Sequence, residues 1–138
     1  MSYIIRSGNL TATPTLRTND TGRHYCFARV AVNDRAKNTE GEWETVGTTF
    51  YDLTVSGSDA TRLIEVAEAS GNVRVVFAGR YSVREYKRKD GTMGTGHNVH
   101  VDEIGISLRG QAVHVISSTP RTDTPPETDD DWREYAEY

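Results

Sequence analysis

One helix-patterned segment stands between two groups of strand-patterned segments, and this order limits the fold more than any other feature of the chain. In residues 58–70 the apolar side chains recur at helical spacing, which predicts an amphipathic helix. Ser58 can cap its start, and the pair Gly71-Asn72 can end it. The apolar positions are Leu63, Ile64, Val66 and Ala67. We therefore expect an all-β domain with one inserted helix.

The segments before the helix begin with a bent strand. Residues 3–10 predict a strand in which Gly8 tolerates a bulge or a close backbone approach. Pro14 prevents an uninterrupted ladder, so a short second piece resumes after it. A turn at residues 20–22 then leads into a long second strand over residues 24–33.

The next two segments are a predicted loop and a third strand. Residues 34–44 are polar and mixed in charge, which predicts a flexible loop. The side chains of residues 48–56 point alternately to the two faces of a strand, so Tyr51, Leu53 and Val55 share the face that should be buried. The opposite face carries Phe50, Asp52, Thr54 and Ser56.

Two strands joined by a hairpin follow the helix. Residues 73–79 are apolar on both faces except at Arg74, as expected for a barrel strand beneath a helix. Residues 81–87 continue to a hairpin turn at 89–91, and the chain returns through residues 99–106. Three strands, a helix and two strands are the element order of the five-stranded oligonucleotide/oligosaccharide-binding (OB) barrel.

The 138 residues predict one domain, residues 1–116, and a tail, residues 117–138. No run approaches the roughly 18 apolar residues of a membrane span, and the first residues lack the pattern of a signal peptide. We expect a cytoplasmic protein with no membrane partner. The single cysteine, Cys26, excludes an internal disulfide and a cysteine-based zinc site, and we expect it to pack as a small core side chain.

The net charge of −4 is unevenly distributed along the chain. From Thr119 onward there are seven acidic and two basic residues, which leaves about +1 on residues 1–118. The tail also contains three of the four prolines, so it cannot bury enough apolar surface to offset its ordering entropy. The sequence therefore predicts a nearly neutral domain with a disordered acidic C-terminal tail.

Binding a single strand without sequence preference requires cations that follow phosphates and aromatic rings on which bases stack. Phe50 lies on the polar face of its strand, although an isolated surface ring or a subunit contact is the alternative. Tyr86 precedes a run of cations on the hairpin. The alternative is that this segment is an ordinary solvated hairpin that binds nothing. Trp43 falls in the predicted loop and would alternatively fold back onto the barrel. The candidate phosphate-binding cations are Arg35, Lys37, Arg80, Arg84, Lys87, Arg88 and Lys89.

Other residues carry weaker signals. Tyr25, Phe27 and Arg29 alternate along the second strand, and they face either DNA or another subunit. His97 and His100 are three apart on a strand, so they point to opposite faces and no metal site is expected. No phosphate-binding glycine loop or nucleophile elbow is present, and we predict neither a cofactor nor an enzyme.

The string from Gly8 to Arg17, Gly-Asn-Leu-Thr-Ala-Thr-Pro-Thr-Leu-Arg, resembles the opening of bacterial-type single-stranded DNA-binding proteins. The resemblance extends over residues 3–110 and includes Gly57, Gly79 and the string Val-Asp-Glu-Ile-Gly at 101–105. It implies an OB barrel that binds and protects single-stranded DNA in replication, recombination and repair. It also implies a homotetramer, usually a pair of dimers, associated with the nucleoid.

The resemblance also bears on individual residues. Phe50 and Tyr86 match stacking positions of the family, and Trp43 matches a loop tryptophan whose placement varies. The family usually has a further aromatic residue where this chain has Ser56, and a basic residue where it has Asp52. These two departures imply weaker stacking or an altered DNA path on that strand.

The tail matches the family only in part. Family members typically end in an acidic run followed by a hydrophobic tip that replication and repair enzymes recognise. Here Asp129, Asp130 and Asp131 resemble the acidic run, and Tyr138 would have to serve as the tip. The alternative is a tail that only solubilises or shields the domain.

Two other functions remain compatible with the sequence. The first is an OB-fold accessory or interaction subunit, of a primosome type or a DNA-uptake paralogue, with weak nucleic-acid binding. The missing aromatic at Ser56 and the unusual tip favour it, whereas the basic hairpin and the complete Gly-Asn-Leu motif count against it. The second is an RNA-binding barrel, because stacking and phosphate contacts discriminate poorly between sugars.

Overall fold

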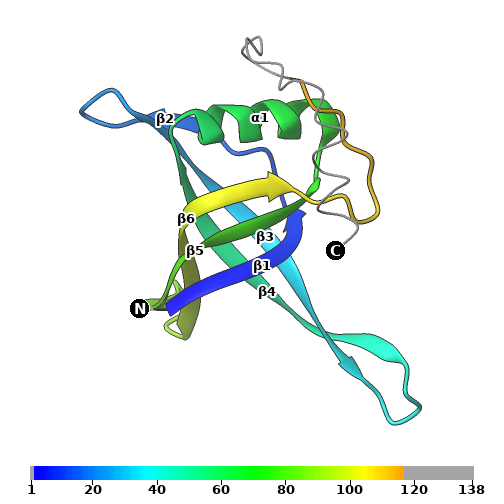
Figure 1. Ribbon diagram of the computed structural model, residues 1–138. Helices are drawn as coiled ribbons and strands as arrows, with labels where there is room; N and C mark the ends of the chain where they lie inside the picture. The colour runs from blue at the N-terminus through cyan, green and yellow to red at the C-terminus, as the bar shows by residue number, and fades with distance from the viewer. Residues whose placement is uncertain (1, 117–138) are drawn as a thin grey trace, which may run out of the picture.

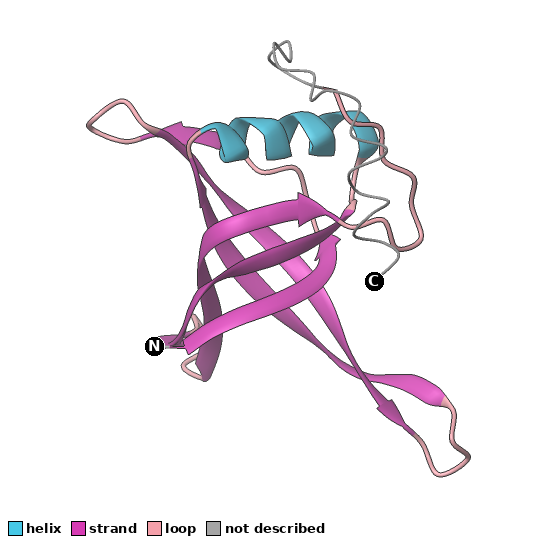
Figure 2. Ribbon diagram, viewed as in Figure 1, coloured by secondary structure: helices cyan, strands magenta, loops and turns pink. Residues whose placement is uncertain are grey.

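The computed structural model describes residues 2–116, which form a β-barrel with one helix over one end (Figures 1 and 2). The predicted tail, with Asp129, Asp130, Asp131 and Tyr138, lies outside the described residues. The elements in chain order are β1 (Ser2–Leu10), β2 (Leu16–Thr18), β3 (His24–Lys37), β4 (Trp43–Ser56), α1 (Ser58–Ser70), β5 (Arg74–Lys87) and β6 (Met93–Ile106).

The strands close into a barrel in the order β1-β5-β6-β4-β3, and β1 returns to pair with β3. All neighbouring pairs are antiparallel except β4 and β6, which run parallel. β1 and β2 are the two pieces of the bent first strand, so the predicted five-stranded OB barrel with a helix after its third strand is confirmed.

The bend in the first strand has a steric cause. β1 pairs with β5 from Ser2 to Asn9 and crosses to β3 at Asn9 and Leu10, before β2 continues along β3. At the crossing, a Cβ on Gly8 would collide with the carbonyl of Ala31, so only glycine allows β1 to pass this close to β3.

Side chains that point inward from every long strand form one core. Its largest fully buried members are Leu10, Val30, Leu53, Val55, Val75, Phe77 and Val99. The helix α1 covers one end of the barrel with Ala60, Leu63 and Ala67 (Figure 1). The predicted alternation in β4 is confirmed, since Tyr51, Leu53 and Val55 are buried and Phe50 and Asp52 are exposed.

The prediction of a loop over residues 34–44 is wrong for most of this segment. β3 and β4 continue through it as a two-stranded arm, and only residues 38–42 form the turn, where Asn38 Oδ1 accepts hydrogen bonds from the backbone N–H groups of Glu40 and Glu42. Both faces of this arm meet water, so the apolar alternation that marks a half-buried strand is missing from its sequence. β6 likewise begins at Met93, before the predicted residue 99.

The predicted cap of the helix is also corrected. Gly57 occupies the N-cap position at φ 71°, and no side chain among residues 2–116 caps the helix by a hydrogen bond. The chain turns sharply from β4 into α1, and a positive φ at this turn favours glycine over serine. Gly71 ends the helix at φ 79°, as the sequence predicts.

Candidate nucleic-acid interface

Phe50 lies on the outer wall of the barrel, where the sequence places it. Its ring is 42% exposed, and the Arg29 guanidinium lies 4.8 Å from the ring centroid. Arg29 is also 3.9 Å from the carboxylate of its cross-strand partner Asp52. Phe50 therefore offers an open ring beside a cation, with one carboxylate close enough to compete for that cation.

Tyr86 lies on the arm formed by the distal parts of β5 and β6, and its ring rests across a glycine. Its cross-strand partner is Gly94, where an added Cβ would lie 2.6 Å from Tyr86 Cζ. At Gly96 an added Cβ would lie 3.9 Å from the ring, which is an ordinary contact. The ring is 44% exposed and lies 5.7 Å from the Arg88 guanidinium. Gly94 thus leaves the space in which the Tyr86 ring lies across β6 while staying accessible.

The predicted cations of β5 and the turn after it are all exposed. They are Arg80, Arg84, Lys87, Arg88 and Lys89. Arg88 also stabilises the turn, because its Nη1 donates a hydrogen bond of 2.9 Å to the carbonyl of Met93 on the other side. Asp90 closes the same turn, and hydrogen bonds from Thr92 hold the pKa of its carboxyl below the usual value.

Trp43 is the first residue of β4 rather than a loop residue, and it does not fold back onto the barrel. Its ring is 59% exposed near the end of the β3–β4 arm, which projects from the barrel away from α1 (Figure 1). Its cross-strand partner Lys37 places Nζ 5.7 Å from the ring, and Arg35 Nη2 donates a 3.4 Å hydrogen bond to the Trp43 carbonyl. The structure thus gathers three predicted residues at one arm.

A further exposed ring lies on β3. Phe27 is 55% exposed, with the Arg17 guanidinium of β2 5.5 Å from its centroid and Tyr25 packed against it edge-on at 5.5 Å. The alternation of Tyr25, Phe27 and Arg29 signals an outer face, but only the pairing of β2 with β3 brings Arg17 to this ring.

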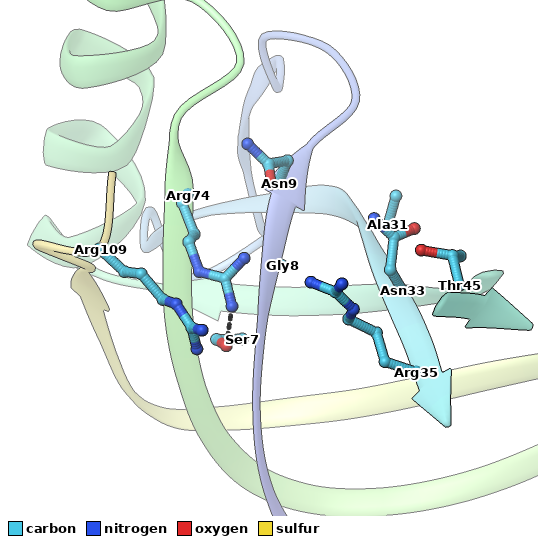
Figure 3. A pocket seen from close by; sticks show the side chains of 9 residues that line it. All are labelled: Ser7, Gly8, Asn9, Ala31, Asn33, Arg35, Thr45, Arg74 and Arg109. Carbon is cyan, nitrogen blue, oxygen red and sulfur yellow. Dashed lines mark hydrogen bonds between the residues drawn. The ribbon is translucent and has the colours of Figure 1, made fainter. Parts of the chain in front are cut away.

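A cavity of about 160 Å³ lies between β1 and β3 on the outer surface of the barrel. Figure 3 shows Arg74 and Arg109 on one side of β1 and Arg35 on the other, and no carboxylate from residues 2–116 lines the cavity. Arg74 Nη2 donates a 2.8 Å hydrogen bond to Ser7 Oγ, whereas its buried Nε has no partner within residues 2–116. Sequence reasoning missed Arg74 and Arg109, because only the folded barrel brings β5 and the turn after β6 to the same cavity as Arg35. The arrangement suits an anion.

His97 lies against an aromatic hydroxyl. The Tyr81 hydroxyl lies 2.7 Å from His97 Nδ1, and the two rings stack at 6.0 Å beside Tyr51. Among residues 2–116 no group of three or more His, Cys, Asp or Glu side chains is placed to hold a metal ion. No helix in this part of the chain is long and apolar enough to cross a membrane.

A closed five-stranded barrel with one helix over its end and exposed rings on its wall defines an OB-fold protein. The model of the family described as "Single-strand binding protein family" matches residues 1–107, and the chain belongs to this family. Single-stranded DNA-binding protein 2 of Streptomyces coelicolor is 29% identical over 113 residues. The single-stranded DNA-binding proteins of Paenarthrobacter aurescens and Mycobacterium tuberculosis are each 33% identical over 103 residues.

These alignments cover 74–81% of the chain but only 56–62% of the three relatives. Among solved structures, the small single-stranded DNA-binding protein from Streptomyces coelicolor has a TM-score of 0.64 at 28% identity. It is matched over 78% of this chain and 95% of that chain. The Plasmodium falciparum SSB complex with ssDNA has a TM-score of 0.57 at 13% identity and the same coverages, so it supports the fold alone.

Proposed function

We propose that this chain binds single-stranded DNA without sequence preference, by stacking bases on exposed rings and pairing phosphates with cations. The observation that carries the proposal is that each predicted ring, Phe50, Tyr86 and Trp43, is exposed and has a cation within 6 Å of its centroid. Family membership supports the same function. Stacking contributes about 1–3 kcal/mol per base, and every base offers a face to stack.

The outer wall offers a continuous path from one ring to the basic cavity. Phe50 pairs with Ala31, Ala31 with Asn9, and Asn9 with Arg74, so these four residues form one row across four strands. If a base stacks on Phe50, the adjoining phosphates of the same strand would lie toward the cavity lined by Arg35, Arg74 and Arg109. Arg74 Nε, which has no hydrogen-bond partner among residues 2–116, would gain an acceptor when a phosphate enters.

The two arms extend this path beyond the barrel. Both project from the end opposite α1 (Figures 1 and 2). Their rings would stack further bases while their cations follow the strand; these cations are Arg35, Lys37, Arg80, Arg84, Lys87, Arg88 and Lys89. The chain would act by stoichiometric binding, which protects single strands during replication, recombination and repair, and not by catalysis.

Assembly into a homo-oligomer, and specifically a homotetramer, belongs to the same proposal. Before β1 crosses to β3, one of its edges pairs with β5 and the other edge has no strand partner within residues 2–116. Three apolar side chains on the adjoining outer surface are exposed, namely Tyr3, Ile5 and Val76. An open strand edge beside exposed apolar side chains favours association with further copies.

The domain division and the tail complete the proposal. Residues 1–116 would form the DNA-binding domain, and residues 117–138 would recruit replication or repair proteins through Asp129, Asp130, Asp131 and Tyr138. The supporting observation is the acidic composition of that segment. We propose that the protein acts in the cytoplasm at the nucleoid, where single-stranded DNA would be available.

Titration of the full chain with oligo-dT, oligo-rU and duplex DNA of equal length tests the function. The Trp43 ring beside Lys37 gives a fluorescence signal. We expect tight binding to oligo-dT, weak binding to duplex, and a steep fall in affinity between two salt concentrations. Affinity for oligo-dT no higher than for duplex would refute the proposal, and tighter binding of oligo-rU would assign the barrel to RNA.

One observation favours the accessory-subunit alternative. Asp52 stands on the outer wall and its carboxylate lies 3.9 Å from Arg29, which otherwise would be free to hold a phosphate near Phe50. Asp52→Asn separates the two functions. A large gain in oligo-dT affinity from an initially weak level would indicate a barrel whose wall is not adapted to DNA.

A further inference from the structure

We infer that Phe27 is an additional base-stacking residue, held ready on β3 by Arg17 and Tyr25. This inference rests on the proposed function and extends it to a part of the outer wall closer to α1. It assigns a single-stranded nucleic-acid base as the ligand of this ring.

The backbone forces the Phe27 ring outward. Its neighbours Cys26 and Ala28 point into the core and are 0% and 2% exposed, so the alternation of β3 directs Phe27 to the opposite face. The ring is 55% exposed, more than Phe50 or Tyr86. An apolar ring this accessible on a strand of the barrel wall is available to a ligand.

The surroundings of the ring fix its orientation without covering it. Tyr25 packs against it edge-on, at an interplanar angle of 75°, and the Arg17 guanidinium lies 5.5 Å from its centroid. The residue opposite on β4 is Thr54, and Tyr25 stands opposite Ser56, so only short side chains flank the ring on that strand. Phe27 is therefore supported on the β2 side and open on the β4 side.

The spacing from Phe50 fits two separate bases. Thr54, the cross-strand partner of Phe27, lies four residues from Phe50 along β4, which corresponds to about 13 Å. Arg29 stands between the two rings, 4.8 Å from Phe50. A strand running along this wall would place successive bases on the two rings and a phosphate near Arg29.

The charge around Phe27 favours a polyanion over a second copy of the chain. Arg17 and Arg29 flank the ring, and Asp52, the carboxylate on this part of the wall, already faces Arg29. By contrast, the exposed apolar group at β1, which comprises Tyr3, Ile5 and Val76, is the better surface for a further subunit. We therefore assign Phe27 to DNA.

Three variants of the full chain test the inference by oligo-dT titration and sedimentation. We expect Phe27→Ala and Phe27→Leu to bind oligo-dT about fivefold to 150-fold more weakly than wild type, with unchanged mass and melting temperature. Phe27→Trp should retain wild-type affinity, because it restores a stacking ring. Val115→Ala, which shortens another exposed apolar side chain outside the barrel wall and both arms, is the control and should bind normally.

Each other outcome overturns the inference. Unchanged affinity in Phe27→Ala removes Phe27 from the interface, and a fall in mass assigns the ring to a subunit contact. An equal loss in Phe27→Leu and Phe27→Trp shows that packing rather than stacking is affected. If wild type binds oligo-dT no better than duplex, the proposed function fails together with this inference, whereas unchanged affinity in Phe27→Ala beside tight wild-type binding overturns this inference alone.

Discussion

Gly94→Ala should weaken DNA binding without any direct contact to DNA, because Tyr86 occupies the space that the new methyl group needs. The added Cβ would lie 2.6 Å from Cζ and 2.8 Å from both Cε2 and the hydroxyl oxygen of Tyr86. Gly94 does not adopt a positive φ, so alanine fits its backbone, and the flexible ring is the group that must move. The variant therefore displaces Tyr86 while preserving the strand.

The size of the effect is bounded by the stacking energy of one ring. Removing the ring in Tyr86→Ala should cost about 1–3 kcal/mol of binding free energy, or about fivefold to 150-fold in affinity. Displacing the ring loses the part of this energy that depends on its position, so Gly94→Ala should fall between wild type and Tyr86→Ala. Titration with oligo-dT, followed by tryptophan fluorescence, gives the three affinities.

Gly96→Ala is the matched control for this prediction. It adds the same methyl group two residues along β6, where the nearest Tyr86 ring atoms are 3.9 Å away and need not move. It should bind like wild type, and thermal melts should show all variants folded. Gly94→Ala binding as tightly as wild type, while Tyr86→Ala binds weakly, would show that the resting position of the ring is irrelevant to stacking. Equal losses in both glycine variants would show that the effect lies in the strand.

Three further predictions concern the cavity, a carboxylate and the thiol. Arg109→Gln should reduce the slope of log affinity for oligo-dT against log salt by about 0.7, the loss of one phosphate contact, and an unchanged slope would remove the cavity from the DNA path. The Thr49 hydroxyl and the Arg6 guanidinium hold the pKa of Asp34 below 3.8, so its ionised form stabilises the fold above that pH and the contribution is lost as the pH falls through the lowered pKa. Asp34→Asn should therefore lower the free energy of unfolding at pH 7, and urea titrations should show this difference shrinking below pH 3.8; a difference independent of pH would contradict this account. Burial raises the pKa of the Cys26 thiol to about 11, so a thiol reagent should label it rapidly only in denaturant, and fast labelling of the native protein would contradict its place in the core.

The sequence predicts the wall of the barrel better than its arms. In β4 the alternation of buried and exposed residues follows directly from the pattern of apolar side chains, which is why Phe50 could be placed on the surface. In the β3–β4 arm neither face is buried, so polar residues stand on both sides and the pattern indicates a loop. Trp43 was consequently assigned to a loop, although it starts a strand opposite Lys37.

Features that depend on long-range pairing escape sequence reasoning altogether. Nothing in the sequence near Arg74 or Arg109 indicates an anion site, and they line one cavity with Arg35 because β1 lies between β3 and β5. The position of the Tyr86 ring over Gly94 likewise depends on the register of β5 and β6. The sequence identifies residue types suited to DNA, whereas strand register decides which of them act together.

The most direct test of the account compares oligo-dT with an abasic oligonucleotide of the same length and charge, at one salt concentration. Both ligands present the same phosphates to the cations, but only oligo-dT can stack on Phe50, Tyr86 and Trp43. We predict that wild type binds oligo-dT at least about tenfold more tightly, since a single stacked base contributes about 1–3 kcal/mol. Equal affinity for the two ligands would contradict the account, because binding would then rest on charge alone.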